Sequence, residues 1–162
     1  MLLHIGTNYQ GYEYARKLEA WLKQAGHDVI WHGADSYDFE DDYPLFSFRV
    51  GHAVIADEDK GLETRGIVVG GTGSGEIVAA NKVNGTRAVP AISVDYVVDA
   101  REHANANILV IGSETTDEAA AQNMITALLN TKFLMSLDDA RRLVNTNEFE
   151  NSGTIEGWMI EG

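Results

Sequence analysis

The sequence has no cysteine among its 162 residues. Without cysteine the chain cannot form a disulfide, use a thiolate as a nucleophile or bind a metal through sulfur. It also lacks any apolar run near the roughly 20 residues that a membrane-spanning helix needs. Its first residues, "MLLHIGTNYQ", lack the basic and long apolar regions of a secretion signal. We therefore expect a cytoplasmic protein that does not bind membranes.

Basic residues are also scarce: the sequence has 12 Lys and Arg but 25 Asp and Glu, which gives a net charge of −13. A surface this acidic repels phosphate backbones, so nucleic acid is not an expected partner. None of the five histidines pairs with a second histidine and an acid at the spacing of metal ligands. A metal site is therefore not expected.

The chain does contain short apolar runs that alternate with helical patterns. The expected strands are 2–7, 28–33, 65–71, 88–93 and 106–112. Helices are expected between the first two strands, after Pro44, and over 74–84, 94–103, 116–130 and 136–148. This alternation predicts an α/β fold, a three-layer sandwich with a five-stranded parallel Rossmann-like sheet and helices on both faces.

The length and the pattern predict one domain over residues 1–148, followed by a C-terminal tail over 149–162. The tail is acidic and punctuated by glycine, but it contains the apolar residues Trp158, Met159 and Ile160. We expect this segment to dock on a partner subunit.

A glycine-rich loop follows the third expected strand, where parallel sheets bind their ligands. The spacing Gly71-x-Gly73-x-Gly75 matches neither the dinucleotide-binding fingerprint nor a P-loop. It suits either a tight strand-to-helix turn or backbone N–H groups that approach an anion closely. The loop ends at Glu76, which is either a favourable acid in the first turn of a helix or a group that transfers protons. In the second case Thr72, Ser74 and the loop amides would hold a developing oxyanion.

The segment "GGTGSGEIVAANKVNGTRA" (70–88) resembles the signature of type B ribose-5-phosphate isomerases and of galactose-6-phosphate isomerase subunits. Three further segments resemble the same family in the same order: 5–34, "DDYPLF" (41–46) and "AREHANANILVIGS" (100–113). The resemblance covers residues 1 to about 145.

This resemblance implies an aldose–ketose isomerase that works through an enediol, with no metal and no organic cofactor. Glu76 would be the proton-shuttling base, and Thr72 would help the loop amides to hold the oxyanion. His103 would open the sugar ring from the partner subunit, although a helix C-terminal cap is its other interpretation. The implied substrate-binding residues are Asn8, Tyr9, Gly71, Gly73, Ser74, Gly75 and Arg142. The implied assembly is a homodimer or homotetramer with active sites between subunits.

Several residues depart from the family pattern, and most of them remove positive charge. The pair Asn8-Tyr9 stands where the family carries Asp-His, and Ala104 stands where it carries Asn. Glu114 replaces an arginine, and the acidic pair Asp138-Asp139 replaces basic residues near the C-terminus.

A phosphate clamp needs arginines and few carboxylates, so the departures predict a sugar or sugar phosphate other than ribose 5-phosphate. Three alternatives remain: an isomerase for another sugar phosphate, an isomerase for an unphosphorylated or differently substituted sugar, or a non-catalytic or half-site sugar-binding subunit of a hetero-oligomeric isomerase. The retained Glu76 favours an isomerase.

Overall fold

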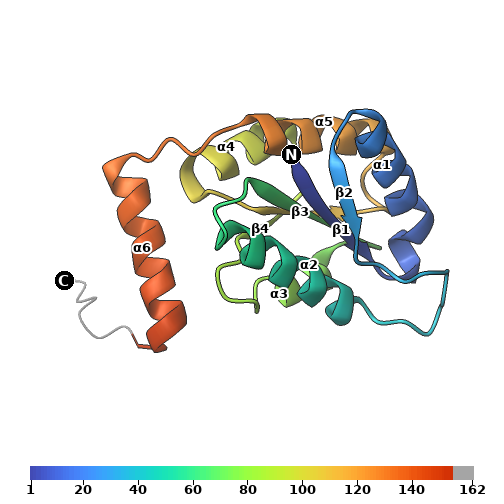
Figure 1. Ribbon diagram of the computed structural model, residues 1–162, viewed down its shortest axis with the longest axis horizontal. Helices are drawn as coiled ribbons and strands as arrows, with labels where there is room; N and C mark the ends of the chain where they lie inside the picture. Colours follow the sequence, from blue (N-terminus) through green and yellow to red (C-terminus); the bar gives the residue numbers. More distant parts are fainter. Residues whose placement is uncertain (155–162) are drawn as a thin grey trace.

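The fold is a three-layer sandwich in which one parallel sheet lies between two layers of helices (Figure 1). The computed structural model describes residues 1–154. The strands lie in the order β2-β1-β3-β5-β4, and each neighbouring pair is parallel. In chain order they are β1 (Leu2–Thr7), β2 (Asp28–Trp31), β3 (Thr64–Gly70), β4 (Ala88–Pro90) and β5 (Ile108–Gly112).

The helices divide between the two faces of the sheet. One face packs against α1 (Tyr12–Gln24), α4 (Val94–Ala104) and α5 (Glu118–Asn130), and the other against α2 (Tyr43–Glu58) and α3 (Ser74–Ala80). A short 3-10 helix, η1 (Tyr9–Gly11), connects β1 to α1. None of the helices within residues 1–154 is long and apolar enough to cross a lipid bilayer.

Each face of the sheet has its own apolar core, and this explains why the central strands are almost continuously hydrophobic. All seven positions of β3 are buried, because helices cover both of its faces. A Cβ on Gly66 would lie 2.8 Å from the side chains of Val50 and Ile108. The glycine therefore lets α2 pack closely over the sheet. The strand order and the helices on both faces confirm the predicted α/β sandwich with its five-stranded parallel sheet.

Several elements are shorter than the sequence predicts. The strand expected over 28–33 ends at Trp31, and the strand expected over 106–112 begins at Ile108. The helix expected over 74–84 ends at Ala80, and the strand expected over 88–93 ends at Pro90. The Asn81 side chain accepts from the N–H of Ala88 at 2.9 Å and donates to the Ala88 carbonyl at 3.0 Å. These two bonds join the end of α3 to the start of β4, and the chain turns there instead of continuing the helix.

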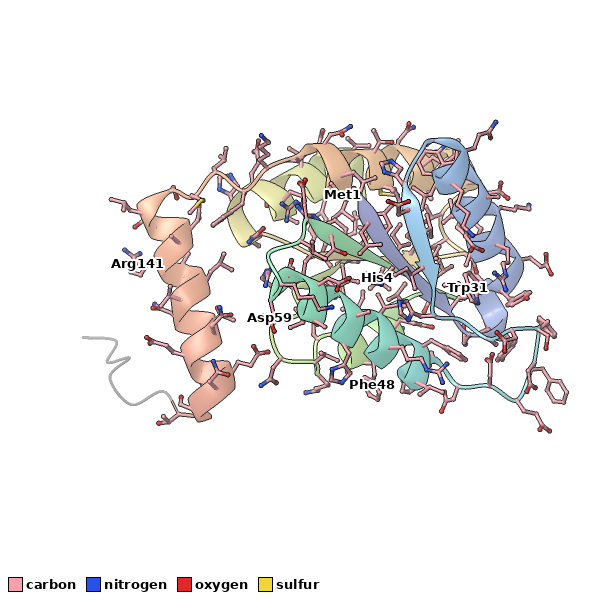
Figure 2. All side chains as sticks on the ribbon, in the orientation of Figure 1. Met1, His4, Trp31, Phe48, Asp59 and Arg141 are labelled. Atoms are coloured by element: carbon pink, nitrogen blue, oxygen red, sulfur yellow. The ribbon has the colours of Figure 1, made fainter. Side chains whose placement is uncertain are left out.

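Helix α6 (Leu137–Ser152) stands apart from the three layers (Figure 1). It continues past residue 148, so the expected boundary between domain and tail falls inside a helix, which ends where Gly153 adopts a φ of 67°. Glu150 accepts a hydrogen bond of 2.7 Å from the N–H of Gly85, while Arg141 lies on the outer side of α6 (Figure 2). The apolar residues expected to dock, 158–160, lie outside the described residues.

Candidate active site

The loops that leave β1, β3 and β5 meet at the carboxyl edge of the sheet, as their positions in the sequence predict. The N–H groups of Ser113 and Glu114 donate to the carbonyls of Gly70 and Gly71 at 2.9 and 3.0 Å. The Ser113 hydroxyl also lies 3.3 Å from the carbonyl of Gln10. These bonds fix the glycine loop between its two neighbours, as a site that must hold its groups in place requires.

Glu76 lies in the first turn of α3, and its carboxyl group folds back over the end of β3. The residue is only 4% exposed. A Cβ on Gly70 would overlap this carboxyl group, so the glycine makes the space that the acid occupies. Burial raises the pKa of Glu76 above its ordinary value, opposed by a hydrogen bond from its own backbone. A carboxyl group in this state is a stronger base than one in water.

Two hydroxyl groups of the glycine loop lie together at its exposed tip. Thr72 Oγ1 and Ser74 Oγ are 3.0 Å apart, and the N–H of Ser74 points to Thr72 Oγ1 at 3.4 Å. The turn between them requires Gly73, whose φ is +84°. A Cβ on Gly75 would lie 2.8 Å from the hydroxyl oxygen of Tyr43, so this ring lies directly against the loop.

The end of β1 contributes a buried amide and a backbone contact to an acid. Asn8 is 3% exposed, and its Nδ2 donates to Gln10 Oε1 at 3.3 Å. Its Oδ1 is buried and has no hydrogen-bond partner within residues 1–154. The N–H of Tyr9 donates to Asp41 Oδ1 at 2.8 Å, and burial raises the pKa of Asp41. A buried acceptor left without a donor is costly, so Asn8 Oδ1 is a natural place for a ligand hydroxyl or a water.

A cavity of about 590 Å³ opens beside the glycine loop, between the β1 and β5 loops and the starts of α1 and α5. Its wall carries three carboxylates, and its single lysine, Lys17, is paired with Glu118 at 2.5 Å. Glu114 is the carboxylate next to the loop, since a Cβ on Gly71 would lie 2.9 Å from its Oε1. The lining residues are Tyr9, Gln10, Glu13, Tyr14, Lys17, Tyr37, Ser113, Glu114 and Glu118.

The structure does not bring His103 or Arg142 to this edge of the same chain. His103 lies in the last turn of α4, just before β5 begins, and therefore at the amino edge of the sheet. Its Nδ1 is 3.0 Å from Oδ2 of Asp139, and Arg142 donates to the other oxygen of that carboxylate at 2.9 Å. Residues 1–154 also contain no group of three or more His, Asp or Glu side chains placed to hold a metal ion.

The sequence model of the Ribose/Galactose Isomerase family matches residues 3–145. The chain belongs to this family. A ribose-5-phosphate isomerase B from Mycolicibacterium paratuberculosis is 38% identical over 94% of this chain and 93% of its own length. A galactose-6-phosphate isomerase subunit LacB from Clostridium acetobutylicum is 33% identical over 82% of this chain and 74% of its own.

Solved structures of the Ribose/Galactose Isomerase family share the fold. A Clostridium thermocellum ribose-5-phosphate isomerase B has a TM-score of 0.86 at 34% identity, over 95% of this chain and all (100%) of that one. The enzyme from Mycoplasma genitalium, solved with bound ribulose 5-phosphate, has a TM-score of 0.85 at 28% identity, over 93% and 97% of the two chains. The predicted family membership is thus confirmed.

The structure places three polar residues in contact with predicted site residues, although the sequence had not assigned them to the site: Asp41, Tyr43 and Asp139. The segment "DDYPLF" was the available signal for the first two, because an acid and an aromatic residue precede a helix start there. For Asp139 the only signal in the sequence was its negative charge.

Proposed function

We propose that this protein is an aldose–ketose isomerase that works through an enediol without a metal ion, on a sugar or sugar phosphate other than ribose 5-phosphate. The observation that carries the proposal is the buried carboxyl group of Glu76, held over Gly70 beside the hydroxyl-bearing glycine loop. Membership of the Ribose/Galactose Isomerase family supports the reaction class. The departures from the family's basic residues support a different substrate.

In the proposed reaction Glu76 takes the proton from C2 of the open-chain aldose and returns it to C1. The electron pair left by that proton forms the C1–C2 double bond while the C1=O π pair moves to the carbonyl oxygen, and the charge that develops there needs hydrogen-bond donors. The hydroxyl proton of O2 then passes to O1, and C2=O forms as the double bond takes the proton from Glu76 at C1. The hydroxyl of Thr72 and the amides of Gly71, Gly73, Ser74 and Gly75 belong to the loop that leads from Gly70 to Glu76 and would supply these donors. The raised pKa of Glu76 suits a base that must accept a proton more readily than an ordinary glutamate does.

Ring opening requires a second proton-transfer group, and we assign it to His103 of another copy of the chain. Because His103 and Glu76 lie at opposite edges of one sheet, a site that uses both needs two subunits. Helix α6 presents exposed apolar side chains, including Leu137 at 91%, that a second copy would cover. The proposed assembly is therefore a homodimer or homotetramer with its active sites between subunits, to which Arg142 would contribute from the partner.

The substrate would place its hydroxyl groups against Asn8 and the cavity beside the loop. Asn8 Oδ1 is a buried acceptor that a sugar hydroxyl would satisfy, and the backbone of Tyr9 is held by Asp41 next to it. The carboxylate of Glu114 lies against Gly71. A phosphate dianion in this acidic cavity would meet repulsion worth several kcal/mol where water is excluded, which disfavours a substrate with a phosphate at this position.

The proposal is tested by proton exchange. The purified oligomer is incubated in D₂O with a panel of free and phosphorylated aldoses and ketoses, and NMR follows deuterium uptake at C1 and C2. Glu76→Gln is the test variant, and Glu40→Gln, an exposed acid in the loop before α2, is the matched control. We expect exchange with at least one sugar, lost by more than about 100-fold in Glu76→Gln and unchanged in the control.

Absence of exchange with every sugar, in an oligomer with native thermal unfolding, would contradict the proposal and indicate a non-catalytic subunit. Exchange that is fastest with ribose 5-phosphate would retain the reaction and refute the assigned substrate class. Exchange that survives Glu76→Gln would assign the base to another residue.

A further inference from the structure

We propose that Asp139 is a positioning residue for His103: its buried carboxylate holds the Nδ1 side of the ring, so that Nε2 is the nitrogen presented to the partner's substrate. The catalytic use of His103 in this inference rests on the proposed function. The ring's placement does not, because it follows from contacts between α4 and α6 in one chain.

The contact joins a buried carboxylate to a half-exposed ring. Oδ2 of Asp139 lies 3.0 Å from Nδ1 of His103, and the two side chains are 7% and 48% exposed. Oδ2 also accepts from the hydroxyl of Ser136 at 2.6 Å, while Oδ1 accepts from Arg142 at 2.9 Å. Three donors therefore surround this carboxylate, and its position is fixed at the N-terminal turn of α6.

These donors decide which ring nitrogen carries the proton. The hydrogen bonds from His103 and Ser136, with Arg142 beside them, lower the pKa of Asp139 to about 2, so it is an ionised acceptor near neutral pH. An ionised carboxylate can only accept, so Nδ1 must be the protonated nitrogen of a neutral His103. Nε2 then carries the lone pair, as a group that takes the anomeric hydroxyl proton during ring opening requires.

The acidic side chains around the His103 ring all favour its protonated form. Asp139 faces it from α6, and Asp99 and Glu102 lie near it on α4. The hydrogen bond to Asp139 is the largest cause that raises the pKa of His103, and the two acids of α4 add to it. Once Nε2 has accepted a proton, the imidazolium is thus stabilised and can return that proton to the ring oxygen as the C1–O bond breaks.

A matched pair of neighbouring aspartates makes the test specific. Asp139→Asn removes the carboxylate at the ring, whereas Asp138→Asn removes the same charge one residue away, from a side chain that is 62% exposed and pairs with Arg141. Long-range ¹H–¹⁵N spectra of the intact oligomer report the tautomer and titration of His103. We expect a single Nδ1–H tautomer and a raised pKa in the wild type and in Asp138→Asn, with mixed tautomers and a lower pKa in Asp139→Asn.

Kinetics then separate positioning from simple anchoring of α6. A ring-forming aldose and an open-chain ketose too short to cyclise are compared as substrates. We expect Asp139→Asn to lower kcat for the ring-forming sugar at least tenfold with little change in KM, to spare the open-chain sugar, and to be partly rescued by Asp139→Glu. An equal loss for both sugars would show that Asp139 only anchors α6 and would overturn the proposal.

The positioning of His103 by Asp139 and the catalytic use of His103 can be refuted separately. If Asp139→Asn leaves the tautomer and the titration of His103 unchanged, the positioning proposal is wrong whatever the activity. If the wild type exchanges no sugar at all, the proposed function fails and ring opening by His103 is wrong with it. In that case the spectra alone decide whether Asp139 positions the ring, because they require no turnover.

Discussion

The carboxyl group of Glu76 occupies the space that a side chain on Gly70 would fill. Gly70 is the last residue of β3 and Glu76 is in the first turn of α3, so the strand end and the helix start shape one another. A single methyl group at residue 70 would therefore displace the proposed base without removing it.

We predict that Gly70→Ala lowers kcat by about 100-fold, since a displacement of about 1 Å at a reacting group has this order of effect. The reason is specific: the Cβ would lie 2.6 Å from Oε2 of Glu76 and closer still to the rest of the carboxyl group. The measurement is steady-state isomerisation or deuterium exchange at a fixed oligomer concentration.

A double-mutant cycle is the control for this prediction. If Gly70→Ala acts through the carboxyl group, it should cost almost nothing further in a protein that already carries Glu76→Gln. Additive losses in the double variant would mean that Gly70 matters for another reason, such as the general shape of the loop.

The buried acid should also reduce stability at neutral pH. Folding raises the pKa of Glu76, so the folded protein binds its proton more tightly than the unfolded chain, and this contribution is lost as pH rises through the folded pKa. Glu76→Gln removes that loss. We expect the variant to unfold at a higher urea concentration than the wild type at pH 8, with the difference vanishing below the ordinary carboxyl pKa, near pH 4.

Urea unfolding at pH 4, 6 and 8 and at one protein concentration checks this prediction. The exposed acid Glu40, replaced by Gln, corrects for the change in net charge. A Glu76→Gln protein that is less stable than the wild type at pH 8 would show that the ionised carboxylate is compensated in the native state.

Two histidines in contact, His4 in β1 and His32 directly after β2, predict a second pH effect on stability. Nδ1 of His4 lies 2.8 Å from Nε2 of His32, and Nε2 of His4 lies 3.1 Å from Asp57 (Figure 2 labels His4). Burial is the largest cause that lowers both histidine pKa values, that of His32 to about 4. Both rings are therefore neutral in the folded protein near pH 7.

An unfolded histidine takes up its proton near pH 6.5. Stability from His32 is then present above pH 6.5 and is lost as pH falls toward about 4. We expect His32→Gln to lose less stability over this interval than the wild type, as measured by thermal unfolding at half-unit steps. His52→Gln, at an exposed position on α2, is the control, and equal slopes for all three proteins would contradict the assignment.

The sheet and the glycine loop could be predicted from the sequence because each depends on local pattern. Apolar runs and amphipathic stripes are properties of single segments, and the carboxyl ends of parallel strands necessarily share one edge. The position of Glu76 follows in the same way, since an acid in the first helical turn after a glycine loop can occupy only a few positions near the end of the preceding strand. The end of α3 did not follow, because the two hydrogen bonds of Asn81 to Ala88, at the start of β4, accompany the turn there.

The partners of His103 could not be predicted because they lie on another helix. Asp138 and Asp139 look equivalent in the sequence, yet one is exposed and the other buried, and only the rotation of α6 against α4 decides which carboxylate meets the ring. The same holds for Tyr43, whose contact with Gly75 depends on how α2 and α3 pack together. Contacts between helices thus add residues to the candidate site that the sequence did not indicate.

Glu114 predicts how the substrate preference can be changed. Its carboxylate lies against Gly71, in the lining of a cavity with two further acids, so Glu114→Arg changes the charge beside the loop by two units. We expect the variant to bind inorganic phosphate about ten to a hundred times more tightly, measured as competitive inhibition of exchange. We also expect kcat/KM for phosphorylated sugars to rise relative to that for free sugars.

Asp28→Arg makes the same change of net charge at an exposed residue at the start of β2, on the opposite edge of the sheet. It should leave phosphate inhibition almost unchanged, because charges more than about 10 Å apart in solvent are screened at ordinary ionic strength. Equal tightening in both variants would assign the effect to the overall charge of −13. Tightening in Glu114→Arg alone would show that one carboxylate beside Gly71 sets the preference against phosphate.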